Sequence, residues 1–185
     1  MRGLTFLAVI VPALFAANPL ADSAQRKLDL ISDQNAKRGS VVTLTPQEIN
    51  AWIGEKAHKA FPQGVRNERI QLGTGTADGE ALVDLLKIAQ AKGREVNGLI
   101  GRLIEGERLL KISLRLESAG GRATVFLTNV ELSGVSISGG ALDLLMKTFV
   151  LPFYPDAKVN QPFDLDYNIE RIDVQPTGVR VSIRK

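Results

Sequence analysis

The sequence predicts an α+β fold in which a curved antiparallel β-sheet wraps around, or packs on, amphipathic helices. Several stretches alternate polar and apolar residues with the period of a β-strand, and short glycine-containing turns connect them. Other stretches repeat apolar residues at the spacing of an amphipathic helix. One strand changes its apolar phase halfway along, as a bulge in a strongly curved sheet requires. We therefore expect about six strands and three or four helices.

Residues 1–23 are predicted to be an export signal. Arg2 supplies a positive charge, and the uncharged, almost entirely apolar run from Leu4 to Ala17 is too short to span a membrane comfortably. Ala21 and Ser23 are small residues at the third-last and last positions before Ala24, which suits cleavage there. Residues 24–185 would then form one domain in the periplasm or cell envelope. An uncleaved anchor and a buried N-terminal helix are the alternatives.

The best-specified local element is a helix that begins after Thr45. Residues 25–38 before it form a polar, weakly helical lead-in, and residues 41–43 suit a short edge strand. In the segment Thr45-Pro46-Gln47-Glu48, the Thr45 hydroxyl can accept from the Glu48 amide while the Glu48 side chain reaches back. The apolar spacing that follows places Trp52 on the buried side of this helix.

Strand-like alternation begins at Val65. Asp78-Gly79 predicts a type I′ hairpin turn, with residues 80–85 as the returning strand. Gly73-Thr74-Gly75 is then interpreted as flexible strand before that turn. A further amphipathic helix is predicted over residues 96–104.

The clearest strand covers residues 110–117, whose leucines and isoleucine alternate with polar residues. Gly120-Gly121 predicts a turn, and residues 122–132 return, with a bulge expected near Thr128-Asn129. Residues 135–138 suit a short strand, and Gly139-Gly140 precedes a leucine-rich helix. A final hairpin is predicted from residues 167–175 and 179–183.

The composition excludes several kinds of chemistry. The chain has no Cys and one His, which excludes thiol nucleophiles, disulfides, zinc–cysteine sites and multi-histidine metal sites. A net charge of +3 and an aromatic content of 5% do not suit nucleic-acid binding. We therefore expect no nucleic-acid partner, no cofactor and no metal, and a chain that is not an enzyme.

The remaining polar candidates have ordinary structural interpretations. His58 lies in the last turn of the helix after Thr45, where a positive charge is favourable. The acidic residues of the C-terminal region lack the glycine and the ligand spacing of a calcium loop; they are Asp164, Asp166, Glu170 and Asp173. A hydrolase with an unusual carboxylate site is the enzymatic alternative.

The chain has more apolar side chains on its predicted helices and strands than polar groups to anchor a ligand. One interpretation is a single closed core. The other is a groove between helix and curved sheet that holds an acyl chain, since a strand of eight residues spans about 27 Å.

Four segments occur in an order that resembles bacterial LmeA-like envelope proteins, which are similar to the tubular lipid-binding (TULIP) superfamily. They are residues 44–53, residues 78–84, residues 135–139 with the helix that follows, and residues 161–172. The resemblance implies a long, highly curved antiparallel sheet that wraps a helix and holds lipid.

On these grounds we expect an exported, non-enzymatic protein that binds a phospholipid or fatty-acyl ligand in an apolar groove. The alternative is a structural or assembly factor of the envelope, with a closed core and a protein partner. The predicted lining is Trp52, Ile53, Leu110, Ile112, Leu114, Leu116, Leu142, Leu145, Met146 and Phe149. Four cations are candidates for headgroup or membrane-surface contact, or else form the solvated faces of their strands: Lys111, Arg115, Arg180 and Arg184.

Overall fold

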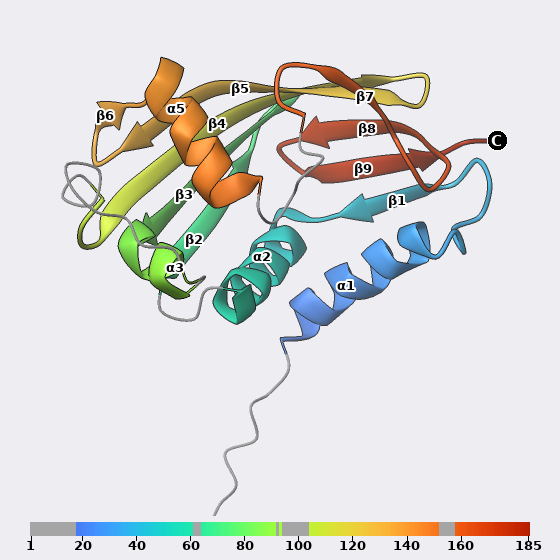
Figure 1. The fold of residues 1–185 in the computed structure, drawn as a ribbon. Helices are drawn as coiled ribbons and strands as arrows, with labels where there is room; N and C mark the ends of the chain where they lie inside the picture. The colour runs from blue at the N-terminus through green and yellow to red at the C-terminus, as the bar shows by residue number, and fades with distance from the viewer. Residues whose placement is uncertain (1–17, 61–63, 92, 94–103, 152–157) are drawn as a thin grey trace, which may run out of the picture.

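The computed structural model describes residues 18–60, 64–91, 93, 104–151 and 158–185, and its strands form two antiparallel sheets (Figure 1). The smaller sheet has the order β1-β9-β8, and the larger, six-stranded sheet has the order β2-β3-β4-β5-β6 with β7 also paired to β5. The strands are β1 (Val41–Leu44), β2 (Val65–Leu72), β3 (Thr76–Val83), β4 (Arg108–Ala119), β5 (Arg122–Leu132), β6 (Val135–Ser136), β7 (Pro162–Asp164), β8 (Ile169–Gln175) and β9 (Gly178–Ile183). The helices are α1 (Pro19–Ser32), α2 (Pro46–Ala60), α3 (Leu85–Ala91), α5 (Gly139–Leu145) and the π-helical turn η1 (Met146–Val150).

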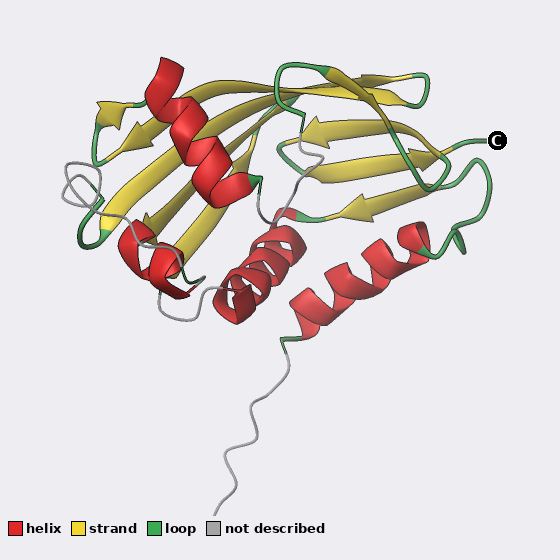
Figure 2. Cartoon of the chain, in the orientation of Figure 1, coloured by secondary structure: helices red, strands yellow, loops and turns green. Residues whose placement is uncertain are grey.

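Figure 2 shows the helices gathered on one side of the strands, which confirms the predicted α+β class and the antiparallel sheet packed on helices. Backbone hydrogen bonds at two glycines join the sheets. Gly75 N donates to Val174 O of β8 at 2.9 Å, and Gly121 N donates to Glu170 O of the same strand at 2.8 Å. The smaller sheet therefore continues from one end of the larger sheet.

The predicted start of α2 is confirmed. Glu48 N donates to Thr45 Oγ1 at 3.2 Å, and Thr45 N donates to Glu48 Oε2 at 2.8 Å, which is a reciprocal capping box. Farther along α2, the Asn50 side-chain amide pairs with the edge strand β2, because it donates to Ile70 O at 2.8 Å and accepts from Ile70 N at 2.6 Å. These bonds attach α2 to the edge of the larger sheet.

The turn between β2 and β3 lies at Gly73-Thr74-Gly75, so the predicted turn at Asp78-Gly79 is wrong. Gly73 N donates to Thr76 O at 2.9 Å, and Gly75 has a φ of +69°, which glycine adopts readily. Asp78 and Gly79 lie inside β3, opposite Gln71 and Ile70 of β2. The two glycines of the real turn made the tight reversal possible five residues earlier than expected.

The β4–β5 hairpin follows the prediction. The strands turn at Gly120-Gly121, and β5 covers Arg122–Leu132. Ser113 of β4 pairs with Asn129, whereas Leu114 pairs with Leu127, so Thr128 is the additional residue of a bulge. The bulge keeps leucine and valine side chains of both strands on one face on either side of it.

Helix α1 begins six residues earlier than the polar lead-in that the sequence suggested, and it is more buried. Its apolar stripe consists of Ala21, Ala24, Leu28 and Ile31, at helical spacing, and Ala24 is completely buried. The stripe was missed because the predicted boundary between residues 23 and 24 falls within it. No helix in the described ranges has both the length and the hydrophobicity that crossing a bilayer requires.

Other helices agree with the prediction in part. The leucine-rich helix begins at Gly139 as expected and continues as η1. A helical stretch was predicted to follow the strand over residues 80–85, and helix α3 begins at Leu85, ahead of the apolar positions that the prediction named. The helix expected over residues 96–104 lies outside the described residues except for Ile104, which is buried.

We predict that a chain beginning at Asn18 is more stable than a chain beginning at Ala24. The shorter chain lacks the Asn18 cap on Leu20 N, the buried Ala21 and the Ser23 hydroxyl that donates to Glu48 at 2.6 Å. A lost cap and a lost hydrogen bond together amount to about 2 kcal/mol. Urea denaturation of the two purified chains measures the difference, and equal stability would show that residues 18–23 add nothing to the fold.

The described core consists of two separate clusters. The first lies between α1, α2 and the smaller sheet, and its buried members are Ala24, Ile31, Val42, Leu44, Ile169, Val181 and Ile183. The second lies where α3 meets one end of the larger sheet, and its buried members are Val83, Leu85, Ile88, Ile104 and Leu132. No large side chain in the described residues is completely buried, and neither cluster includes residues from the middle of the larger sheet.

Candidate functional site

One face of the larger sheet carries mainly apolar side chains on its four long strands. Strand pairing brings Leu110 opposite Leu132, Ile112 opposite Val130, Leu114 opposite Leu127 and Leu116 opposite Val125. Directly opposed residues of an antiparallel pair point to the same face. We call this surface the apolar face; its members on the four long strands are Ile70, Leu72, Ala77, Gly79, Ala81, Val83, Leu110, Ile112, Leu114, Leu116, Val125, Leu127, Val130 and Leu132.

The ends and the middle of the apolar face differ in burial. Val83 and Leu132 are buried in the second core cluster. In the middle, Val130 opposite Ile112 is also buried, outside both clusters. The other middle residues belong to neither cluster and are only partly buried; we call them the open segment, which consists of Ile70, Leu72, Ala77, Gly79, Ile112, Leu114, Leu116, Val125 and Leu127. These partly buried apolar residues are contiguous over the four long strands.

Small residues on β3 lower the surface in the middle of the open segment. Ala77 and Gly79 lie between the larger residues of the two neighbouring strands, with Gly79 opposite both Ile70 and Ile112. A Cβ built on Gly79 would approach only the Ile112 carbonyl oxygen, at 3.9 Å. The surface of the open segment is therefore lowest over β3. It runs along that strand, whose eight residues span about 27 Å.

Helix α5 crosses in front of β3, β4 and β5 (Figure 1). It buries none of its residues, and Leu144 is 42% exposed. Leu145 contacts the second core cluster, whereas α5 and η1 approach the strands far more sparsely than α2 approaches β2. The helix therefore covers the apolar face loosely within the described residues.

The structure separates the predicted lining into three groups. Trp52 belongs to the first core cluster and its Nε1 donates to Gln25 of α1 at 2.8 Å, while Leu110 and Leu145 pack against the second cluster. Trp52 is therefore at one cluster, and Leu110 and Leu145 are at the other. The partly buried residues outside both clusters are Ile53, Ile112, Leu114, Leu116, Leu142 and Met146. The side chain of Phe149 lies outside the described residues.

The four predicted headgroup cations are on the opposite faces of their sheets. Arg115 lies 4.1 Å from the Phe126 ring centroid and forms an ion pair with Glu117. Arg184 forms an ion pair with Glu170 at 3.3 Å. Lys111 lines a depression of about 320 Å³ that also contains Asp78 and Glu80, and Arg180 is exposed opposite Asp173 and Thr43. They form the solvated faces of their strands, which was the second interpretation of the sequence.

Two charged residues that were not predicted from the sequence, Arg108 and Glu68, are associated with the apolar face. Arg108 lies opposite the buried Val83, two residues before Leu110, and its Nε is shielded from solvent without a hydrogen-bond partner. Glu68 of β2 lies against Gly54 of α2, and its Oε2 is likewise shielded and unpartnered. The period of two already placed Arg108 in phase with Leu110, so the sequence contained a signal for it.

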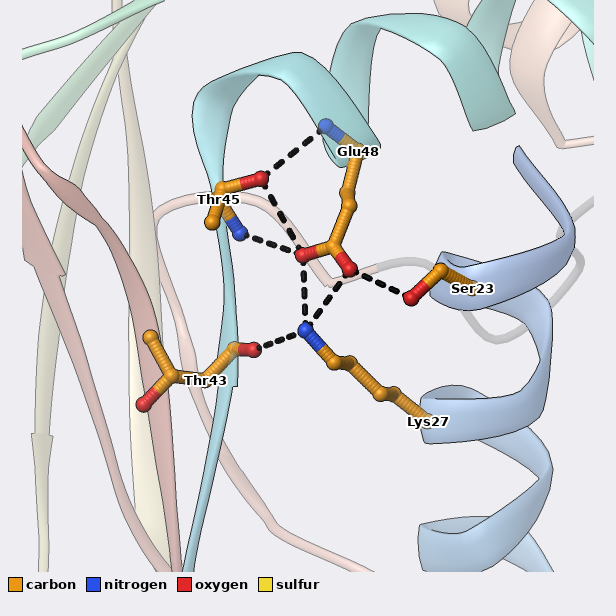
Figure 3. Close-up of polar contacts among 5 residues, drawn as sticks. All are labelled: Ser23, Lys27, Thr43, Thr45 and Glu48. Atoms are coloured by element: carbon orange, nitrogen blue, oxygen red, sulfur yellow. Dashed lines mark hydrogen bonds and ion pairs between the residues drawn. The ribbon is translucent and has the colours of Figure 1, made fainter. Parts of the chain in front are cut away.

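A polar network joins α1, the end of β1 and the start of α2 (Figure 3). Lys27 Nζ lies 2.7 Å from Glu48 Oε1, 2.8 Å from Glu48 Oε2 and 2.8 Å from Thr43 O. Ser23 Oγ donates to Glu48 Oε1 at 2.6 Å. Glu48 therefore connects three elements while it caps α2.

These contacts set the charge of Glu48. Burial alone would raise the pKa of this carboxyl, but hydrogen bonds from Lys27, Ser23 and Thr45 outweigh it and lower the pKa from 4.5 to about 2. Glu48 is therefore ionised at neutral pH with all its neighbours acting as donors. Such a group stabilises the fold and is unsuited to act as a general acid or base.

Within the described ranges, no group of three or more His, Asp or Glu residues is placed to hold a metal ion. Comparison of the chain with protein-family models, with curated proteins and with solved structures gives no match. The open segment is the candidate functional site, on the grounds of its apolar character and its incomplete burial.

Proposed function

We propose that this protein binds the acyl chain of a phospholipid or similar amphiphile along the open segment. The observation that carries the proposal is that leucines and isoleucines in the middle of an apolar sheet face stay partly exposed, between two core clusters that share no residue within the described ranges. Burying such a surface against a hydrocarbon chain contributes about 25 cal/mol per Å² of apolar area. A linear acyl chain suits it, because the open segment is long and runs along β3.

The loosely packed helix α5 supports the same function. Leu142 and Met146 lie on a helix that crosses the apolar face without burying any of its own residues. An apolar ligand between helix and sheet would contact both. Met146 begins the π-helical turn η1, and such turns occur frequently at functional sites.

The resemblance to LmeA-like proteins and to the TULIP superfamily remains a prediction, as do the export signal and the location in the envelope. A protein partner that covers the open segment is the alternative occupant. A linear hydrocarbon is favoured because the residues of the open segment are aliphatic and carry no polar side chain, whereas protein interfaces commonly include aromatic residues and arginine near the centre.

The test is the uptake of a fluorescent fatty acid by delipidated protein. Leu114→Trp inserts a bulky ring into the open segment, and we expect it to weaken binding about tenfold, which corresponds to about 1.4 kcal/mol. Lys111→Trp is the matched control, because it adds the same ring to the opposite face of β4, and its affinity should equal that of the wild type.

Met146→Trp repeats the test from the helix side, in case Leu114→Trp perturbs the strand. Circular dichroism establishes that each variant is folded. Unchanged uptake by both folded variants would contradict binding at the open segment. A wild-type protein that takes up no fatty acid, and from which solvent extracts no lipid, would instead favour the protein-partner alternative.

A further inference from the structure

We infer that the amphiphile carries an anionic headgroup, carboxylate or phosphate, and that the guanidinium of Arg108 binds it at one end of the apolar face. This inference rests on the proposed function and adds the class of ligand. Arg108 is the first residue of β4, and the strand pairing places it opposite Val83, whose buried side chain faces α3. Its side chain is thus on the same face as the open segment.

The state of the Arg108 side chain indicates a missing partner. It is partly buried, its Nε is shielded from solvent, and that nitrogen has no hydrogen-bond acceptor. The described part of the chain contains no carboxylate in an ion pair with it, although Arg66 and Arg115 of the same sheet each have one. Buried donors in proteins are nearly always hydrogen-bonded, so an exception calls for an explanation.

The chemistry of a guanidinium narrows the ligand. Its planar fork of N–H donors matches the two oxygens of a carboxylate or a phosphate, and it is charged at every physiological pH. An uncharged headgroup such as an alcohol would satisfy one donor and leave the charge unpaired. An anionic headgroup satisfies both requirements.

The position of Arg108 suits an amphiphile. The open segment begins at Ile112 on the same strand, about 13 Å from Arg108 at the usual rise per residue, and ends at Leu116. Leu110, between them, is itself partly buried and apolar. A headgroup at Arg108 therefore places the acyl chain along β4 and β3, in the direction of the small residues Gly79 and Ala77.

Glu68 defines the side on which the headgroup binds. It lies on β2, across β3 from Arg108, and its unpartnered carboxylate repels an anion. An anionic headgroup is thus held on the β4 side of the apolar face. Removing the charge of Glu68 should strengthen anion binding, whereas removing that of Arg108 should weaken it.

The experiment compares three ligands that share a twelve-carbon chain: dodecanoate, dodecyl phosphate and dodecanol. In isothermal titration calorimetry at low salt, we expect the wild type to bind at least one of the two anions about tenfold more tightly than dodecanol. Arg108→Gln should abolish this preference and leave the affinity for dodecanol unchanged. Arg69→Gln, which removes an exposed arginine from the opposite face of β2, is the matched control and should retain the preference.

The outcomes separate the two proposals. A wild type that binds all three ligands equally, or an Arg108→Gln variant that keeps the preference, would overturn the headgroup assignment and leave acyl binding intact. A wild type that binds none of them would overturn the proposed function itself. The two anions distinguish the sources of the charge, since a preference for dodecyl phosphate indicates a phospholipid and a preference for dodecanoate indicates a fatty acid.

Discussion

Replacing Glu48 by alanine should lower the free energy of unfolding by about 3 kcal/mol, since the change removes one partner of a largely buried ion pair and a helix cap together. The Glu48 side chain is 6% exposed, and it accepts from Lys27, Ser23 and Thr45. The expected loss is at the lower end of the range for breaking a buried ion pair, because Lys27 is 33% exposed and can be solvated. Urea denaturation, monitored by circular dichroism, measures this loss of stability.

Glu55→Ala is the matched control on the same helix. Glu55 pairs with Lys59 one turn away, and both side chains are exposed, so its replacement should cost no more than about 0.5 kcal/mol. Equal losses for the two variants would mean that helix propensity, and not the network around Glu48, determines the effect.

The stability that Glu48 contributes should depend on pH. The pKa of Glu48 is about 2 in the folded chain against 4.5 as the ordinary value, so protonation favours the unfolded state. The contribution is fully present above pH 4.5 and is lost as the pH falls toward 2. The stability difference between wild type and Glu48→Gln should therefore narrow over this range. A difference that stays constant down to pH 2 would contradict the lowered pKa.

Gly178→Ala should destabilise the fold by about 3 kcal/mol, as the sum of backbone strain and a steric clash. Gly178 begins β9 with a φ of +147°, and a Cβ there would lie 2.4 Å from Leu44 O and 3.5 Å from Thr45 Cα. Both neighbours are backbone atoms at the point where β1 passes into the capping box of α2. A methyl group at this position therefore has to displace β1 from β9 or the start of α2 from the sheet.

Gly134→Ala separates the two causes of this loss. Gly134 has a φ of +81°, and nothing lies within 4 Å of a Cβ built on it. Its replacement adds strain without a clash and should cost about 1 kcal/mol. If Gly178→Ala were no more destabilising than Gly134→Ala, close approach of β1 would not be the reason for glycine at residue 178.

Both positions bear on the candidate site through the arrangement of the two sheets. Glu48 and Gly178 hold β1, β9 and α2 together at the first core cluster, and Asn50 attaches α2 to the edge of the larger sheet. The second core cluster holds the other end of that sheet. The open segment lies between these two clusters, and its described side chains belong to neither of them.

Local patterns were sufficient for the elements whose stabilising contacts are close in sequence. The capping box joins residues three apart, and the β4–β5 hairpin turns at two adjacent glycines. The bulge at Thr128 was visible because it changes which residues of β5 are apolar. In each case the hydrogen bonds or the side-chain alternation that define the element are contained in a few consecutive residues.

The sequence by itself thus determined the fold class, the start of α2, the β4–β5 hairpin and the apolar character of one face of β4. Only the tertiary structure decided that Gly79 lies in mid-strand, that Trp52 contacts α1 instead of the open segment, and that the Nε of Arg108 is shielded without a partner. The reason is that strand register and burial depend on groups tens of residues apart, such as Trp52 and Gln25 or Lys27 and Glu48. No local pattern specifies which of several apolar surfaces will pack together and which will stay open.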